Sequence, residues 1–147
     1  MKGRKIVYLL FALLFAGSCC SKKGACPALK FDSFELIDFS QEDVAEVRMI
    51  RYVANSNFTT VLDSSTLKAE PSGNNFVLKT QNLSIDYDYG IYSVPLNKLY
   101  KINRFTGEKI ICGKCFLKQN NQFGYQLNGY SVNNKPQEYE GTVRIRK

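Results

Sequence analysis

The sequence predicts an all-β protein with at most one short helix. Short segments rich in β-branched and aromatic residues recur about every ten residues from Phe31 onward. Gly, Asn, Pro and Ser, the residues that favour turns, separate these segments. Ten Phe and nine Tyr, with no Trp, supply most of the bulk for a core between two layers of strands.

The first elements follow from alternation of apolar and polar residues. Phe31–Phe39 alternates and predicts a strand, and Ser40–Asp43 resembles a helix start with a side-chain cap. Val47–Val53 predicts a second strand because β-branched and aromatic residues dominate it. Phe58–Leu62 predicts a third strand, followed by a turn at Asp63–Ser65.

The middle of the chain contains the clearest glycine signals. Pro71–Asn75 predicts a turn, with Gly73 at positive φ, between a weak strand at Thr66–Ala69 and a stronger one at Phe76–Thr80. Ile85–Val94 predicts either one strand with a bulge at its glycine or two strands.

The last third predicts paired strands joined by short turns. Leu99–Phe105 and Ile110–Leu117 flank Thr106-Gly107, which predicts a hairpin turn. Phe123–Leu127 pairs through Asn128-Gly129 with Tyr130–Val132, because Asn-Gly is a strong hairpin signal. After a break at Asn134–Pro136, Glu138–Arg146 alternates as a closing strand.

Eight to ten strands at this spacing are typical of a β-sandwich or a barrel. We therefore expect a single sandwich of the immunoglobulin-like or transthyretin-like type, with a small closed barrel as the alternative.

The first twenty residues form a three-part secretory signal. A basic head containing Lys2, Arg4 and Lys5 precedes eleven apolar residues, Ile6–Ala16. A membrane-spanning helix needs about 20 apolar residues, so this run is too short to be an anchor. Small residues, Gly17 and Ser18, then precede two cysteines.

This ending resembles the lipobox of bacterial lipoproteins. Ala16-Gly17-Ser18 before Cys19 fits that pattern, and counting back from Cys20 fits it less well. The resemblance implies that Cys19 carries diacylglycerol, that cleavage occurs just before it, and that the new amino terminus also receives an acyl chain such as palmitate. It divides the chain into a signal peptide (1–18), a lipidated tether (19–30) and a sandwich domain (31–147).

The resemblance also implies a location. The residues after Cys19 include Lys22 and Lys23 and no acidic residue. In Gram-negative lipoproteins this composition favours the periplasmic face of the outer membrane, with the membrane as a partner through the lipid. The layout is similar to that of small envelope lipoproteins of Gram-negative gut bacteria.

Charge argues against nucleic acid as a partner. The chain carries a net charge of +7, from 20 basic and 13 acidic residues. Removal of 1–18 takes away three basic residues and leaves +4. The remaining Lys and Arg are scattered along the sequence and form no run of the kind that binds phosphate backbones.

The chain contains no histidine, which excludes several chemistries. No Ser-His-Asp or Cys-His arrangement, no imidazole general base and no His-based zinc site is possible. We therefore expect no cofactor, no metal and no catalytic residue.

Cysteines carry the remaining chemistry. With Cys19 lipidated, four cysteines remain: Cys20, Cys26, Cys112 and Cys115. They allow three connectivities. The candidates for a disulfide are Cys112 with Cys115, or either of these with Cys26. Cys112-Gly-Lys-Cys115 has the spacing of thiol–disulfide oxidoreductases and of half a zinc site. Apolar strand residues surround it, so a structural disulfide is the preferred interpretation.

Two further patterns have a structural and a functional interpretation. Asp86 and Asp88 fall on one face of a strand and could bind a cation or act as an acid–base pair, but an exposed polar face is the simpler interpretation. The tyrosines, Tyr87 and Tyr89 among them, could form a sugar-binding face, and we expect them to form core instead.

These observations rank three functions. The first is a non-enzymatic lipoprotein of the cell envelope that binds or scaffolds a protein or glycan partner. The second is a periplasmic thiol–disulfide protein that uses Cys112 and Cys115. The third is an assembly subunit that pairs through an edge strand, with Glu138–Arg146 as the candidate.

Overall fold

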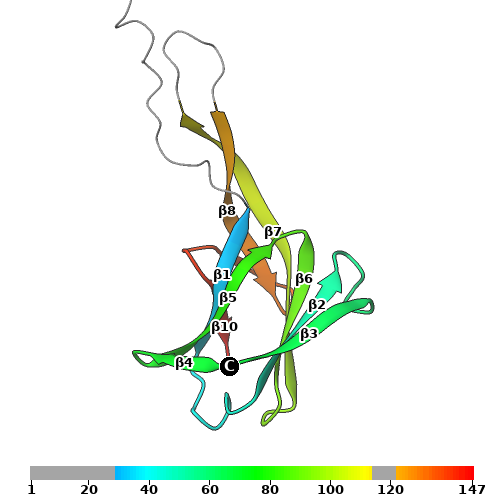
Figure 1. Ribbon diagram of the computed structural model, residues 1–147, viewed down its shortest axis with the longest axis vertical. Coiled ribbons are helices and arrows are strands. Elements are labelled where there is room, and N and C mark those ends of the chain that lie inside the picture. Colours follow the sequence, from blue (N-terminus) through cyan, green and yellow to red (C-terminus); the bar gives the residue numbers. More distant parts are fainter. Residues whose placement is uncertain (1–28, 114–121) are drawn as a thin grey trace, which may run out of the picture. The chain divides into compact units, whose positions relative to one another are not determined.

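The structure, a computed structural model, describes residues 29–113 and 122–147. Within these residues the regular structure consists of strands (Figure 1), as the sequence predicts, and no helix is present. The strands are β1 (Lys30–Ile37), β2 (Val47–Val53), β3 (Val61–Leu67), β4 (Ala69–Ser72), β5 (Asn75–Ser84), β6 (Tyr87–Ser93), β7 (Lys98–Gly113), β8 (Gln122–Val132), β9 (Lys135–Glu138) and β10 (Val143–Arg146).

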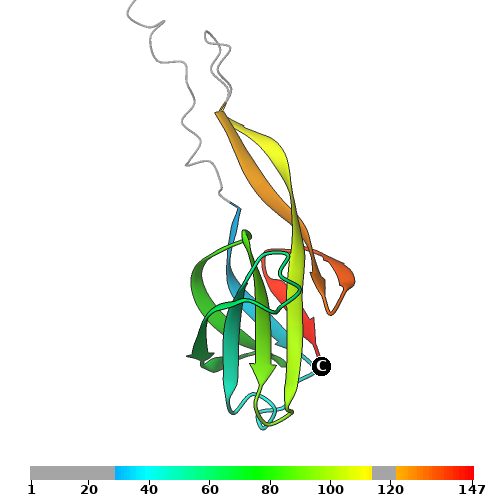
Figure 2. The same cartoon turned by 90° about the vertical axis from the view of Figure 1, so that its right-hand side faces the viewer.

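The strands form two sheets. One sheet has the order β10-β1-β5-β4, and the other has the order β3-β2-β6-β7-β8-β9. β1 pairs parallel with β10. The pairs β1–β5, β2–β3, β2–β6, β4–β5, β6–β7 and β8–β9 are antiparallel. Figure 2 shows β2, β6 and β7 running side by side. The two sheets pack together and do not close, so the β-sandwich is confirmed and the barrel alternative is wrong.

The described residues divide into two compact units. The main unit contains residues 29–108 and 126–147, and it holds both sheets of the sandwich. The smaller unit contains, among the described residues, 109–113 at the end of β7 and 122–125 at the start of β8. The signal peptide (1–18) and nearly all of the proposed tether lie outside the described residues.

Aromatic side chains from both sheets form the core. Phe31 and Phe34 of β1 lie edge-on to Tyr89 of β6, at ring-centroid distances of 5.5 and 6.2 Å. Phe31 also stacks on Phe105 of β7 at 5.3 Å. Aromatic pairs of this kind contribute about 0.5–1.5 kcal/mol each beyond the area they bury. The tyrosine-rich core expected from composition is therefore present at Tyr89, which is fully buried.

Local irregularities keep large side chains on the core face. In β1 the register shifts between Phe31 and Ser33, so Phe31 and Phe34 are both buried although they are three residues apart. In β7 Arg104 has a φ of +53°, and Phe105 packs against the core while Arg104 is exposed. Strict alternation would have placed Arg104 on the same face as Ile102, which is buried.

Two predicted hairpin turns are instead parts of long strands. Thr106-Gly107 lies inside β7, and Asn128-Gly129 lies inside β8. The Thr106 hydroxyl donates a hydrogen bond of 2.9 Å to Asn128 Oδ1, so the two sites join neighbouring strands. At Gly129 a Cβ would lie 2.7 Å from Thr106 Oγ1. This glycine permits a close approach between strands where the sequence predicted a turn.

The chain does turn a few residues later. Asn133 and Asn134 have φ values of +49° and +66°, the pattern of a type I′ turn, and they connect β8 to β9. The predicted closing strand Glu138–Arg146 is wrong as one element. Its first residue ends β9 in the six-stranded sheet, whereas Val143–Arg146 forms β10 in the other sheet.

The loop before β3 also differs from the prediction. Phe58 was expected to begin a strand, but it has a φ of +61° and its ring packs edge-on against Tyr52 at 5.2 Å. This packing compensates for an unfavourable backbone conformation. The strand begins at Val61, and the predicted turn Asp63–Ser65 is part of it, paired with β2.

The predicted helix start at Ser40 forms its cap without a helix. The Ser40 N–H donates to Asp43 Oδ2 at 2.7 Å, and the Asp43 N–H donates to Ser40 Oγ at 3.3 Å. These are the reciprocal bonds of a capping box. The backbone forms a turn before β2 begins at Val47, so the cap stabilises a turn instead.

At the predicted bulge, β6 is one regular strand. Gly90 lies opposite Ile50 of β2 with no register shift. A Cβ at Gly90 would lie 2.8 Å from Leu99 Cδ1 and 3.1 Å from Tyr52 Cε2. A side chain at Gly90 would therefore force Leu99 or Tyr52 to shift, and the backbone at Gly90 forms no bulge.

Candidate functional site

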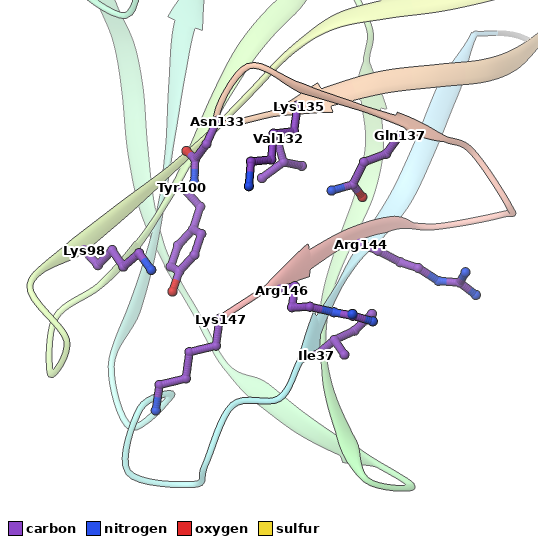
Figure 3. Close-up of a pocket in the computed structure, with 10 residues that line it drawn as sticks. All are labelled: Ile37, Lys98, Tyr100, Val132, Asn133, Lys135, Gln137, Arg144, Arg146 and Lys147. Atoms are coloured by element: carbon purple, nitrogen blue, oxygen red, sulfur yellow. The ribbon is translucent and has the colours of Figure 1, made fainter.

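A cavity of about 560 Å³ lies in the main unit, between side chains of both sheets (Figure 3). We call it the basic seam, because five of the residues that line it are Lys or Arg. The lining residues are Ile37, Lys98, Tyr100, Val132, Asn133, Lys135, Gln137, Arg144, Arg146 and Lys147.

Strand alternation brings β10 to the seam with its charges outward. Val143 and Ile145 are fully buried, and Arg144 and Arg146 between and beyond them line the cavity. The parallel pairing of Leu36 with Ile145 in the neighbouring β1 fixes this orientation.

The turn between β8 and β9 supplies the opposite wall. Asn133 is held against β7 by two hydrogen bonds: its N–H donates to the Lys101 carbonyl at 2.8 Å, and the Lys101 N–H donates to Asn133 Oδ1 at 2.9 Å. The turn therefore places Lys135 and Gln137 of β9 at the cavity.

One hydroxyl group links the two walls. The Arg144 N–H donates a hydrogen bond of 2.6 Å to the Tyr130 hydroxyl. This hydroxyl in turn donates a hydrogen bond of 3.1 Å to Gln137 Oε1. Burial raises the pKa of Tyr130, so the phenol stays protonated and can donate. The edge of β10 is thus tied to β8 through a side chain.

The charges of the seam are compensated at one end and not at the other. Acidic residues pair with three of the five cations: Glu35 and Glu140 with Arg144, Asp38 with Arg146, and Asp43 with Lys147. Lys98 and Lys135 have no ion pair with any described residue. The positive charges of Lys98 and Lys135 are therefore not compensated by an acidic residue of the described chain.

Tyr100 leaves a polar atom in the wall at that end. Its side chain is 1% exposed, and its ring packs on Phe39 at 5.5 Å. The hydroxyl oxygen has no hydrogen-bond partner among the described residues, which is costly for a buried group. The Lys98 ammonium group lies 4.8 Å from the centre of the ring (Figure 3). Lys98 therefore covers the ring of Tyr100 at the wall of the cavity.

The carboxylate of Asp43 anchors the chain end next to the seam. Lys147 Nζ donates to Asp43 Oδ2 at 2.6 Å, and the Ser93 hydroxyl donates to the Asp43 carbonyl at 2.6 Å. The hydrogen bond from Lys147, followed by the one from the Ser40 backbone, lowers the pKa of Asp43 to about 2. The carboxylate is therefore charged, and its Oδ2 accepts hydrogen bonds from both Ser40 and Lys147.

The predicted cysteine sites are only partly described. Cys112 lies in β7, so its backbone is strand. Cys19, Cys20, Cys26 and Cys115 lie outside the described residues, as does the proposed lipidation. No group of three or more Cys, Asp or Glu side chains with metal-binding geometry occurs in the part of the chain that is described.

The two carboxylates predicted to share a strand face have different surroundings. Asp86 lies in the turn before β6 and accepts a 2.6 Å hydrogen bond from the Ser84 hydroxyl. Asp88 is buried and accepts a 3.0 Å hydrogen bond from the Asn55 N–H, and burial raises its pKa. Asp88 therefore fixes the loop after β2, and the two residues do not act as a pair.

Three of the described tyrosines that could have formed a sugar-binding face lie in the core instead. Tyr89, Tyr100 and Tyr130 are buried in the core. Tyr87 lies under the guanidinium group of Arg51 at 4.8 Å. Core is thus the correct interpretation for the buried residues.

The residues of the seam were not singled out from the sequence. Its basic residues are spread from Lys98 to Lys147, and scattered charge normally indicates a solvated surface. The alternation in Glu138–Arg146 indicated a strand and no site. Nothing local indicated that β10 would leave its neighbour β9 and pair with β1.

Comparison with protein-family models, curated proteins and solved structures finds no match to this chain. In the described residues, no helix has the length and apolar character needed to cross a membrane.

Proposed function

We propose that this chain is a lipid-anchored, non-enzymatic binding protein of the cell envelope, and that its sandwich holds an acidic group of a protein partner in the basic seam. The observation that carries the proposal is the Lys98–Lys135 end of the seam. Lys98 and Lys135 line the seam there without an ion pair to any described residue, and the Lys98 ammonium group lies over the ring of the buried Tyr100.

The chemistry of these groups favours an anion. Lysine ammonium groups donate hydrogen bonds, and a carboxylate accepts several at once. A neutral glycan would instead require an exposed aromatic face, and the ring of Tyr100 is buried with Lys98 above it. An acidic protein segment is therefore preferred to a neutral glycan.

The proposed location rests on the lipobox-like segment that ends at Cys19. Two or three acyl chains there would hold the protein at a membrane surface without a spanning helix. Mass spectrometry of the protein from membranes should find diacylglycerol on Cys19 as the first residue. Cys19→Ser should abolish this modification, and Cys20→Ser should leave it intact. An unmodified amino terminus in the wild type would contradict the anchor.

Binding can be tested with the full chain in detergent and a fluorescent hexaglutamate peptide. We expect binding that weakens as salt rises from 0.1 to 1 M, because the Debye length falls from about 10 to about 3 Å. The double variant Lys98→Gln/Lys135→Gln should lose most of this affinity. A matched control is Lys30→Gln/Lys68→Gln, which removes two exposed lysines elsewhere and the same net charge.

The control variant distinguishes binding in the seam from a general attraction by net charge. If both double variants lose affinity equally, the peptide senses net charge alone and the seam is not the site. If hexaglutamate fails to bind while a neutral glycan binds, the proposed ligand chemistry is wrong.

The thiol–disulfide alternative makes a different prediction. A reactive first cysteine normally needs a lowered pKa, for example at a helix N-terminus. The strand backbone at Cys112 does not provide that feature. Titration of native thiols should therefore show no rapidly reacting thiolate at pH 6, and a rapid reaction lost in Cys112→Ser would support the redox function instead.

A further inference from the structure

The two sheets have four edge strands, and three of them are protected against pairing with another chain. β4 and β9 are four residues long, and each contains a proline, Pro71 and Pro136. β10 is also four residues long, and its Arg144 N–H is already bonded to the Tyr130 hydroxyl. Short length, proline and capped donors are the usual means of preventing edge-to-edge association.

The fourth edge, β3, lacks most of these protections. It has seven residues, Val61–Leu67, and contains no proline, lysine or arginine. A register shift opposite Arg51 and Tyr52 is its only irregularity, and Asp63 is its only charged residue. Its side chains are exposed at every position except Leu67, which is partly buried.

Exposed apolar side chains gather at one end of this edge. Val61 is 57% exposed and Leu62 is 46% exposed, and the adjacent Val53 of β2 is 39% exposed. Only one other large apolar side chain among the described residues, Tyr125, is as exposed. An apolar, unprotected edge of this length is a template for an added strand.

The alternation of backbone groups tells which atoms of β3 face outward. The Val53 N–H donates to the Thr60 carbonyl at 3.0 Å, so the odd-numbered residues of β2 direct their backbone groups toward β3. Their partners Ser65 and Leu67 therefore use their N–H and C=O groups on β2. Ser64 precedes Ser65, and Thr66 lies between Ser65 and Leu67. Both therefore present their N–H and C=O groups to the side of β3 that has no neighbouring strand.

We propose that β3 pairs antiparallel with β3 of a second copy of this chain, about a two-fold axis at Ser64. The sequence of the edge is self-complementary in this register. Val61 lies opposite Leu67 of the second copy, and Leu62 lies opposite its Thr66. Asp63 lies opposite Ser65, so no like charges face each other.

A second copy fits this edge better than an unrelated strand does. A two-fold axis through the middle of a seven-residue strand repeats every contact, so the Val61–Leu67 contact forms twice. On the axis itself, the two Ser64 residues exchange two backbone hydrogen bonds. The result is one continuous sheet through two sandwiches, and it leaves the basic seam, at the other edge of the six-stranded sheet, accessible.

The test is sedimentation equilibrium of the full chain in density-matched detergent, over a range of protein concentrations. The wild type should associate reversibly to a dimer. Ser64→Pro should weaken association about tenfold or more, because the two backbone hydrogen bonds at the axis are lost. The fold should survive, because this N–H does not pair with β2. Circular dichroism and thermal unfolding measure that, and Ser64→Thr is the matched control with the N–H retained.

A charge exchange tests the register itself. Ser64→Lys and Ser64→Glu should each weaken self-association, because like charges would lie opposite each other on the axis. An equimolar mixture of the two variants should restore a dimer. The proposal is overturned if the wild type stays monomeric at every concentration, if Ser64→Pro dimerises as the wild type does, or if the mixture associates no better than either variant alone.

Discussion

The backbone N–H of Arg144 in β10 donates a 2.6 Å hydrogen bond to the hydroxyl of Tyr130 in β8, so a single side chain joins the two sheets of the sandwich. The Tyr130 ring is 2% exposed and also contacts Phe105 and Tyr139. This bond removes the free donor from the edge of β10 and places the arginines of that strand beside the seam.

Tyr130→Phe should therefore destabilise the domain by about 1–3 kcal/mol, because it leaves the partly buried Arg144 N–H without an acceptor. Chemical denaturation measures the change. The matched control is Tyr139→Phe, whose hydroxyl donates a 2.9 Å bond to the Gly141 carbonyl at an exposed position. An equal loss in both variants would show that Tyr130 does not link the sheets.

The carboxylate of Asp43 predicts an acid-sensitive stability. Its folded-state pKa is lowered from 3.8 to about 2, chiefly by the hydrogen bond from Lys147. A lowered folded-state pKa stabilises the native state above the unfolded-state value, and this stabilisation is lost as the pH falls through the folded-state value. We expect the free energy of unfolding to decrease from about pH 4 to about pH 2 for this reason.

Asp43→Asn should remove this part of the pH dependence and lower the stability at neutral pH. Thermal unfolding at a series of pH values from 2 to 7 measures both effects. Asp38→Asn is the control, because Asp38 is exposed and its contact with Arg146 is longer, at 3.5 Å. Identical pH profiles for the wild type and Asp43→Asn would contradict the assignment.

Gly90→Ala should be costly although alanine suits a strand better than glycine does. The new Cβ would lie 2.8 Å from Leu99 Cδ1 and 3.1 Å from Tyr52 Cε2, so we expect a loss of about 1–3 kcal/mol from overpacking. A double-mutant cycle measures the cause. Leu99→Ala removes the nearest atom, so Gly90→Ala should cost clearly less in that background. Additive losses would mean that the strain at Gly90 comes from elsewhere.

Local sequence patterns were most reliable where side chain and backbone preferences agreed. Val47–Val53 was predicted with the bounds that β2 has, because β-branched and aromatic residues dominate it. Gly73 was predicted at positive φ and has a φ of +61° in the turn between β4 and β5. In both cases the residues within the segment were enough to decide its conformation.

The wrong turns share one physical cause. Thr106-Gly107 and Asn128-Gly129 carry turn signals. Each nevertheless lies inside a strand, β7 or β8, that has a neighbouring strand on both sides in the sheet. Pairing of these strands offers more backbone hydrogen bonds than two isolated hairpins would. Gly129, which indicated a turn, instead leaves room for the side chain of Thr106.

The sequence by itself determined the all-β class, the burial of aromatic residues in a core, and the exclusion of histidine chemistry, because composition and alternation are properties of each segment alone. The tertiary structure decided which strands became neighbours. Only the parallel pairing of β10 with β1 brings Arg144 and Arg146 to the same cavity as Lys98 and Lys135. Such contacts join residues far apart in the chain, and no local preference encodes them.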